Sequence, residues 1–317
     1  MTKKTVQQIY SIVVPVYNSC STLEPLVIRV TKVLKNAEIP FELLLVDDGS
    51  SDDSFLEIKR LSSIFFGVRG YRLSRNFGHQ AALSVGLQQA NGNYVAIIDD
   101  DLQDPPELLS VLYKKLQDGY DVAYGVRQKR KEGLVKRVLF RSFYKILTLV
   151  SRVDIPQDSG DFCAMRRCVV DAMLEMYDAT PFLRGFRYWV GFRQIGVEYE
   201  RSARFQGESG YTLRKYIKLA MTGILMFSNL PLRLSTYLGL AASFIACSFT
   251  IVAFIIWSIR PFNVPGYLST IVLIAFMGGV QLVSSGILGE YMIRLLDNSR
   301  RWPIAIVAEK TEEDSGS

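Results

Sequence analysis

The chain has 317 residues, of which 49% are apolar, and a formal net charge of +6. This length exceeds one typical domain and predicts roughly two structural units. The basic excess fits anionic lipid and phosphorylated substrates. We expect no nucleic-acid binding, because no element combines basic and aromatic residues into a recognition surface. The four cysteines lack the spacing of metal ligands and are expected to be free thiols: Cys20, Cys163, Cys168 and Cys247.

Strand and helix patterns alternate through the first hundred residues. Apolar strand patterns cover residues 10–18, 41–46 and 68–73, and helical patterns cover 23–34, 53–62 and 80–89. This alternation predicts an α/β fold with a mostly parallel sheet and right-handed crossovers. In such sheets ligands bind at the carboxyl ends of the strands. Polar clusters at 15–18, 47–52, 75–79 and 99–103 lie at or just past these ends, which favours a phosphate and metal site over unrelated turns.

The strand pattern that begins at Val95 runs into three consecutive carboxylates, Asp99, Asp100 and Asp101, followed by Gln103. Adjacent like charges repel one another, and a divalent cation would relieve that repulsion. Alternate residues of an extended segment point the same way, so Asp99 and Asp101 are expected to face one site. Their oxygen ligands suit Mg²⁺ or Mn²⁺, shared with the phosphates of a substrate. The alternative is a solvated acidic turn.

A second set of candidates follows the strand pattern at 120–127, which ends in Arg127. Arg137 and Arg141 are four residues apart and share one face of a predicted helix. Arginine suits bidentate phosphate recognition, although a solvated or lipid-facing basic surface is the alternative. Asp158 and Asp161 then lie in a loop containing Gly and Ser, which is either a plain turn or part of a site.

Two long uncharged segments, 234–259 and 261–289, dominate the C-terminal third. Each exceeds the roughly 20 residues needed to cross a bilayer, which predicts two transmembrane helices; a buried helical hairpin is the alternative. The N-terminus shows no apolar signal-peptide region. Basic residues precede the first segment and follow the second, and the positive-inside rule therefore places both of these ends in the cytoplasm. We therefore expect a cytoplasmic α/β domain (1–210), an amphipathic interfacial or ordinary packed helix (211–233), two membrane helices (234–295) and a cytoplasmic tail (296–317).

Four motifs in this order resemble the family 2 glycosyltransferases with a GT-A fold: Val14–Asn18, Val46–Ser50, Arg75–His79 and Asp99–Gln103. Over about residues 10 to 300 the chain is more narrowly similar to the polyprenyl-phosphate glycosyltransferases. These include dolichyl-phosphate mannose synthase and the GtrB-type bactoprenol glucosyl transferases. The resemblance implies inverting transfer of a hexose, with UDP-glucose as the expected donor, to an undecaprenyl-type phosphate. It also implies Mg²⁺ or Mn²⁺, a location at the cytoplasmic face of the inner (plasma) membrane, and a homo-oligomer, expected to be a tetramer.

The resemblance assigns roles to individual residues. The nucleotide would be held by Pro15, Tyr17, Val46 and Asp48, with Asp99 and Asp100 also at the donor. The metal would be held by Asp99, Asp101 and Gln103, and Arg204 would meet the donor diphosphate. The lipid phosphate would be bound by Arg127, Arg137 and Arg141. Asp158, with Asp161 as second choice, would lie near the reacting centre. Because a monophosphate is mostly ionised at neutral pH, Asp158 is expected to position the acceptor or to act as a base of modest effect.

The chain departs from the family pattern at Ser19, where Glu is common, and at Gly210, where Lys is common. Two rival functions follow from other features. Asn298–Trp302 is similar to the Gln-x-x-Arg-Trp signature of polysaccharide synthases, but it lacks the Gln and follows the second apolar segment. A membrane-anchored module that binds a nucleotide sugar without catalysis is the other rival, and the intact acidic motif argues against it.

Overall fold

The computed structural model describes residues 9–127, 159–176, 178–179, 181–200, 230–259 and 267–311. The chain divides into two compact units, one comprising 1–145, 153–211 and 301–317 and the other 146–152 and 212–300. Several predicted features lie outside the described residues: Arg137, Arg141, Asp158, Arg204 and most of the expected amphipathic segment at 211–233.

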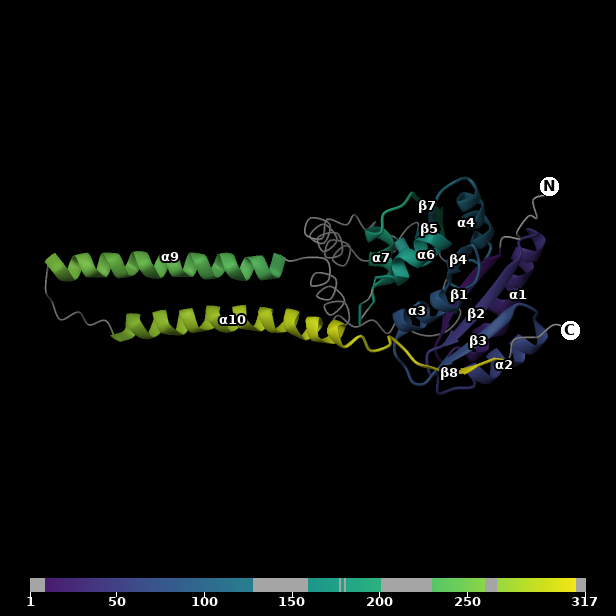
Figure 1. Ribbon diagram of the computed structural model, residues 1–317, viewed down its shortest axis with the longest axis horizontal. Coiled ribbons are helices and arrows are strands. Elements are labelled where there is room, and N and C mark those ends of the chain that lie inside the picture. The colour runs from purple at the N-terminus through teal and green to yellow at the C-terminus, as the bar shows by residue number, and fades with distance from the viewer. Residues whose placement is uncertain are drawn as a thin grey trace. The chain divides into compact units, whose positions relative to one another are not determined.

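The first unit contains one sheet of order β7-β5-β6-β4-β1-β2-β3-β8 (Figure 1). Its elements are β1 (Tyr10–Val16), α1 (Cys20–Asn36), β2 (Phe41–Asp47), α2 (Ser54–Ile64), β3 (Val68–Leu73), α3 (His79–Gln89), β4 (Tyr94–Ile97), α4 (Leu108–Gln117), β5 (Val122–Arg127), β6 (Ser159–Arg166), α6 (Arg167–Leu174), α7 (Leu183–Trp189), β7 (Gln194–Tyr199) and β8 (Val307–Lys310). The pairs β1–β2, β1–β4, β2–β3 and β5–β7 are parallel. β6 is antiparallel to β4 and β5, and β8 is antiparallel to β3. The expected mostly parallel α/β sheet is confirmed.

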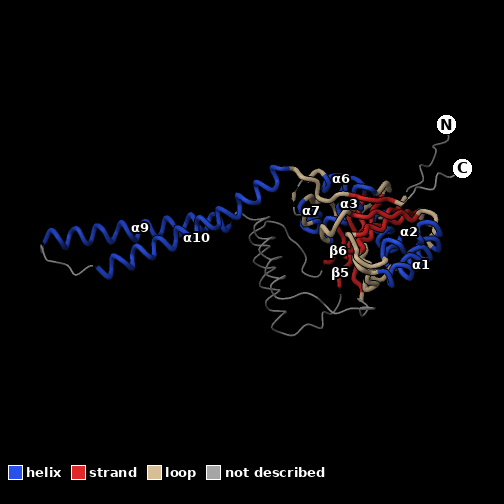
Figure 2. The backbone as a smooth tube through the Cα atoms, turned by 90° about the horizontal axis from the view of Figure 1, so that it is seen from below, coloured by secondary structure: helices blue, strands red, loops and turns tan. Residues whose placement is uncertain are grey.

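Both faces of the sheet are covered by helices, which is why its inner strands are almost continuously apolar. The helices α1, α2 and α4 cover one face, where their leucines and isoleucines pack on Ile12, Leu45 and Ala96 (Figures 1 and 2). On the opposite face α3 approaches β1 so closely that a Cβ at Gly86 would lie 2.2 Å from Cγ1 of Val13. This packing fixes the start of α3, where His79 lies, against the carboxyl ends of the strands.

The acidic stretch after β4 does not continue as a strand. β4 ends at Ile97, Asp100 and Asp101 lie in a turn, and Leu102 has a left-handed φ of 57° with a buried side chain. The expectation that alternate residues here point the same way from an extended segment is therefore wrong. The physical reason is local: Oδ1 of Asp101 accepts a hydrogen bond from the Gln103 amide at 3.1 Å, the kind of contact by which Asp favours turns over strands.

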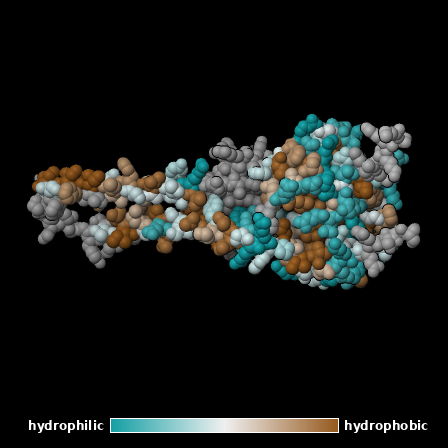
Figure 3. Space-filling model, in the orientation of Figure 1, coloured by the Kyte–Doolittle hydropathy of each residue, from teal (hydrophilic) through white to brown (hydrophobic). Residues whose placement is uncertain are grey.

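The second unit consists of two long helices that pack on each other, α9 (Leu230–Ile259) and α10 (Tyr267–Arg300) (Figures 1 and 2). Both expose large apolar side chains, among them Phe244 and Leu282, and this surface is brown in Figure 3. Within the part of the chain that the structure describes, α9 alone passes the length and hydropathy test for a membrane span, through Leu232–Phe249. The second predicted span remains a prediction.

Candidate active site

The polar clusters that follow β1, β2, β3 and β4 are joined by hydrogen bonds at one edge of the sheet. The Asn18 amide donates to Oγ of Ser50 at 2.9 Å, which links the ends of β1 and β2. The Tyr17 amide donates to Oδ2 of Asp100 at 3.4 Å, which links β1 to the acidic turn after β4. The prediction that these clusters meet at the carboxyl edge is confirmed.

Asp48 joins the end of β2 to the loop after β3. Its buried carboxylate accepts hydrogen bonds from the amide of Phe77 at 2.7 Å and from the amide of Gly78 at 2.9 Å. Gly49 permits this approach, since it has φ +66° and a Cβ there would lie 2.5 Å from the carbonyl carbon of Arg75. Burial raises the pKa of Asp48, while the two amides oppose that rise. A carboxylate retains lone pairs after two such bonds, so Asp48 can still accept a hydrogen bond from a ligand.

His79, the single histidine of the chain, lies between two carboxylates. Its Nε2 is 3.8 Å from Oδ1 of Asp99 and 3.6 Å from Oδ2 of Asp161. Burial disfavours the charged ring, but the hydrogen bond to Asp161 and the charge of Asp99 outweigh it and raise the pKa of His79 to about 9. Burial raises the pKa of Asp99 to about 7, although His79 opposes that rise. At neutral pH a cation therefore lies beside the first carboxylate of the acidic motif.

Asp161 lies among positive charges supplied by α3 and α7. Nε of Arg184 donates to Oδ1 of Asp161 at 3.2 Å, and His79 lies on the other oxygen. Burial raises the pKa of Asp161, but the charges of Arg184 and His79 outweigh it and hold that pKa well below its usual range. Arg187 adds a further positive charge that lowers the pKa of Asp161. This arginine is only 2% exposed, and its guanidinium carbon lies 5.0 Å from the ring centre of Tyr124. Asp161 is therefore ionised and is a poor proton acceptor at neutral pH.

Arg127 ends β5 within a second buried network. It pairs in register with Tyr199 at the end of β7, and its Nε donates to the Tyr199 hydroxyl at 3.2 Å. That hydroxyl donates to Oδ1 of Asp104 at 2.5 Å, and the Arg127 guanidinium lies 3.5 Å from Oδ2 of Asp104. Burial raises the pKa of Tyr199, and the charge of Asp104 adds to that rise. The network holds Arg127 in place and leaves 20% of its side chain exposed.

Comparison with known proteins identifies the family. The profile described as glycosyl transferase family 2 matches residues 11–174. The chain is 40% identical to the uncharacterized glycosyltransferase YkcC of Bacillus subtilis (strain 168), over 94% of this chain and 93% of the relative. It is 36% identical to the bactoprenol glucosyl transferase of Shigella phage SfV, over 96% of this chain and 99% of the relative. The chain belongs to glycosyl transferase family 2.

A solved structure is also similar to this family 2 glycosyltransferase. It is glucosyl-3-phosphoglycerate synthase from Mycobacterium tuberculosis, crystallised with Mn²⁺, UDP-glucose and phosphoglyceric acid. The identity is 19% and the TM-score 0.49, with 69% of this chain and 78% of that chain covered.

The predicted donor residues of this glycosyltransferase differ in how they can reach a ligand. The side chains of Pro15 and Val46 are buried in the sheet, where the two residues pair, so any ligand contact runs through their backbone atoms. Tyr17 is half exposed and Asp100 partly exposed. Burial raises the pKa of Asp100, while hydrogen bonds from Ser19 and from the Tyr17 amide oppose that rise.

Four residues of these networks lie outside the sequence motifs: Asp104, Arg184, Arg187 and Tyr199. Asp104 lies inside the acidic stretch, so its charge was visible in the sequence. The two arginines belong to the short helix α7, and Tyr199 ends β7; neither element was predicted. A buried arginine leaves no periodic signal in a sequence, because charged residues are expected at the surface.

The oxygen ligands proposed for a metal fit a site in which the cation is shared with the diphosphate of a substrate. Among the described residues, no three His, Cys, Asp or Glu side chains gather closely enough to hold a metal by themselves. Mg²⁺ that is shared with a diphosphate needs only one or two carboxylates. Oδ1 of Asp99 is buried with no hydrogen-bond partner among the described residues, but it faces His79. Asp101 and Gln103 lie in the turn beside it, and their oxygens have the chemistry that a hard cation prefers.

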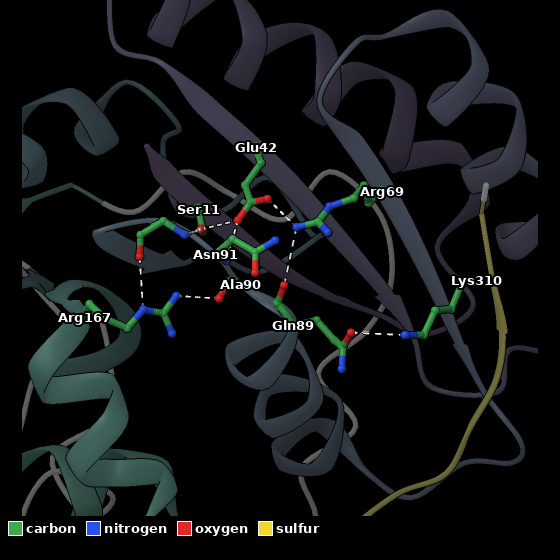
Figure 4. Close-up of polar contacts among 9 residues, drawn as sticks. Ser11, Glu42, Arg69, Gln89, Ala90, Asn91, Arg167 and Lys310 are labelled. Atoms are coloured by element: carbon green, nitrogen blue, oxygen red, sulfur yellow. Dashed lines mark hydrogen bonds and ion pairs between the residues drawn. The ribbon is translucent and has the colours of Figure 1, made fainter. Parts of the chain in front are cut away.

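Two cavities border the C-terminal strand of the sheet. The larger, about 520 Å³, lies toward the amino ends of the strands and is lined by residues that include Arg69, Gln89 and Lys310. Figure 4 shows that these polar groups bond to one another: the Arg69 guanidinium pairs with Glu42, and Nζ of Lys310 is 3.3 Å from Oε1 of Gln89. The smaller, about 320 Å³, lies at the carboxyl edge between Gly49, the end of β3 and β8. The smaller cavity is thus the one beside the candidate active site.

Proposed function

We propose that this glycosyltransferase transfers glucose from UDP-glucose to an undecaprenyl-type polyprenyl phosphate and inverts the anomeric configuration. The observation that carries this proposal is the 36% identity to a bactoprenol glucosyl transferase over 96% of the chain and 99% of the relative. The acidic turn and the cations around it suit a charged donor at the carboxyl edge of the sheet.

In the proposed reaction an oxygen of the lipid phosphate attacks the anomeric carbon as the bond to the diphosphate breaks. The phosphate has a second pKa near 6, so its oxygen is already ionised at neutral pH and needs little help from a base. This suits the charge of Asp161, which is paired with Arg184 and His79. We propose a positioning role for Asp161 and keep Asp158 near the reacting centre, either as a positioner of the acceptor or as a base of modest effect.

The departing diphosphate develops negative charge, which the protein and a cation would stabilise together. Asp101, Gln103 and the adjacent Asp99 would hold Mg²⁺ or Mn²⁺ against the diphosphate, and the bound cation would neutralise part of that charge. Arg204 is proposed to contact the same diphosphate. Fixed charges aimed at a developing charge are among the strongest contributions to catalysis.

The acceptor phosphate is proposed to meet Arg127, Arg137 and Arg141. Arg127 is held by Asp104 and Tyr199, so it offers a guanidinium whose orientation is set before the lipid arrives. Arg137→Ala should raise the KM for polyprenyl phosphate much more than the KM for UDP-glucose, because its proposed partner is the lipid phosphate alone. An equal rise in both KM values would remove Arg137 from the acceptor site.

A membrane location follows from the lipid substrate and the apolar helices. We propose that α9 and α10 both span the inner membrane, with the catalytic unit and both termini in the cytoplasm, and that the protein works as a homo-oligomer, with a tetramer expected. The apolar window of α9 is only 11% buried within the protein, which fits contact with lipid tails.

The test is a donor screen with the full chain in vesicles. UDP-glucose, other UDP-sugars and GDP-mannose are offered with and without undecaprenyl phosphate, and both UDP release and the glycolipid are measured. We expect glucosyl lipid only with UDP-glucose and only when the lipid phosphate is present. Binding of UDP-glucose without any lipid-dependent UDP release would instead identify a binding module.

A further inference from the structure

The strand β8 comes from the C-terminal tail and completes the edge of the catalytic sheet beside β3. Tyr71 pairs with Lys310, Arg72 with Glu309 and Leu73 with Val307. Backbone hydrogen bonds extend the pairing at both ends. The Thr311 amide donates to the Gly70 carbonyl at 2.9 Å, and the Ser74 amide donates to the Ile306 carbonyl at 2.9 Å.

Side chains on both sides of β8 strengthen this contact. Nζ of Lys59 in α2 lies 2.5 Å from a carboxylate oxygen of Glu309. Nζ of Lys310 lies 5.5 Å from the ring centre of Tyr71 and donates a hydrogen bond to Oε1 of Gln89 at 3.3 Å (Figure 4). Oγ1 of Thr311 accepts a hydrogen bond from the Gly70 amide at 2.9 Å. The tail is thus fastened to α2, β3 and the end of α3.

The pairing reaches directly into the candidate active site. Ser74, whose amide bonds to Ile306, begins the segment Ser74–Gly78, here called the donor loop. The other end of the donor loop is held by Asp48, whose carboxylate accepts hydrogen bonds from the amides of Phe77 and Gly78. Ala308 and Glu309 form one wall of the 320 Å³ cavity, and the start of the donor loop forms another. The donor loop therefore has two anchors, one from β2 and one from the tail.

We infer that β8 is a positioning element of the donor site, which holds the donor loop against Asp48 so that the nucleotide-binding edge is formed before UDP-glucose arrives. The inference rests on the proposed function, because it takes the donor to be a nucleotide sugar bound near Asp48. An unpaired edge strand exposes its N–H and C=O groups, and a segment with few fixed contacts opens locally. If only a fraction of molecules has the donor loop in place, the apparent affinity for the donor falls by that fraction.

The test compares two substitutions at one position in the full chain. Glu309→Pro removes a backbone N–H within β8, and Glu309→Ala removes only the contact with Lys59. We expect the Kd for UDP-glucose with Mg²⁺, measured by calorimetry, to rise about tenfold in Glu309→Pro, which corresponds to one molecule in ten with the donor loop in place. Glu309→Ala should stay within about twofold, because an exposed ion pair contributes little. The KM for undecaprenyl phosphate should be unchanged in both.

Hydrogen exchange of residues 70–78 shows whether the pairing is lost. Faster exchange in Glu309→Pro together with weaker UDP-glucose binding supports the inference, whereas faster exchange with unchanged binding overturns it. A second pair of variants covers the case in which the proline is accommodated: a chain ending at Pro303 lacks β8, and a chain ending at Thr311 keeps it. Equal UDP-glucose binding by these two chains, both folded, also overturns the inference. Wild-type protein that binds no nucleotide sugar would contradict the proposed function instead.

Discussion

At the scale of single residues, the carboxylates of Asp99 and Asp161 keep the His79 ring charged at neutral pH. Because the chain has one histidine, the NMR spectrum of protein isotopically labelled only at histidine reports on the His79 ring alone. We expect that signal to titrate with a midpoint near 9 in metal-free buffer. In Asp161→Asn the midpoint should fall by about 1 pH unit or more, since a neighbouring opposite charge typically shifts a pKa by that amount. An unchanged midpoint would show that Asp161 does not hold His79.

The same titration predicts how stability depends on pH. The pKa of His79 is higher in the folded protein than the 6.5 of an unperturbed histidine, so the charged ring stabilises the fold below about pH 6.5 and this contribution is lost as pH rises through about 9. The groups facing the ring are Asp99, Asp161, Asp100 and Asp48. Asp99, with a pKa near 7, is mostly ionised above pH 8 and changes little from there.

We therefore expect the melting temperature of the metal-free protein to fall between pH 8 and 10 more steeply in wild type than in His79→Gln. Since 45% of the His79 side chain is exposed, solvent screens the interaction and the difference should be only a few degrees. Parallel curves for the two proteins would mean that His79 adds nothing to stability in this range.

Asp101 carries the metal prediction. Asp101→Asn keeps the shape of the side chain and removes one charge, so turnover should fall roughly 10² to 10³-fold, the range typical for loss of an electrostatic stabiliser. EDTA should abolish turnover, and Mg²⁺ or Mn²⁺ should restore it. The measurement is UDP release in vesicles with undecaprenyl phosphate. Full activity in EDTA would exclude the proposed metal.

At the scale of elements, the pairing of β5 with β7 places Arg127, the proposed ligand of the acceptor phosphate, opposite Tyr199. Tyr199→Phe removes the hydroxyl that joins Arg127 to the buried Asp104. The free energy of unfolding should fall by about 1–3 kcal/mol, the cost of leaving a buried polar group with one partner fewer. The KM for polyprenyl phosphate should rise because Arg127 keeps only its ion pair with Asp104 and is less firmly oriented, while that for UDP-glucose should not change. Chemical denaturation and steady-state kinetics measure the two effects.

The elements that could be predicted from sequence are those whose signal is local. Val68–Leu73 has the predicted bounds, and α1, α2 and α3 differ from prediction by a few residues at their ends. The sequence favours a loop around Asp158 and Asp161, whereas Ser159–Arg166 forms β6; Gly160 and Asp161 obscure the strand signal, because Gly and Asp are uncommon in strands. β8 has four residues and pairs with a strand far away in the sequence, so no local pattern could reveal it.

The same contrast holds for the candidate site. The acidic motif and the loop after β3 were recognisable because their residues are consecutive. The partners that decide their charges were not, since Arg184 meets Asp161, and Asp161 meets His79, only after the chain has folded. Position in the fold, and not residue type, distinguishes Asp161 as an ionised carboxylate paired with Arg184 and His79.

At the scale of the whole molecule, the cysteines give a direct test of membrane topology. Cys168 is exposed on α6 of the catalytic unit, and Cys247 is exposed on α9 within the apolar window. In single-cysteine variants, a membrane-impermeant maleimide should label Cys168 in inside-out vesicles but not in intact cells. Cys247 should be labelled only after denaturation, because lipid tails would cover it. Labelling of Cys247 in intact vesicles would contradict a membrane position for α9.

The late position of β8 in the chain also determines when the catalytic sheet is finished during biosynthesis. β3 ends at Leu73, whereas its partner strand begins at Val307. At translation rates of about 5–20 residues per second, the edge of β3 stays unpaired for roughly 10 to 50 seconds after it leaves the ribosome. During that interval its free N–H and C=O groups are open to pairing with other nascent chains. Each molecule therefore completes its sheet only after α9 and α10 have been synthesised, and its cellular yield should depend on factors that shield this edge until then.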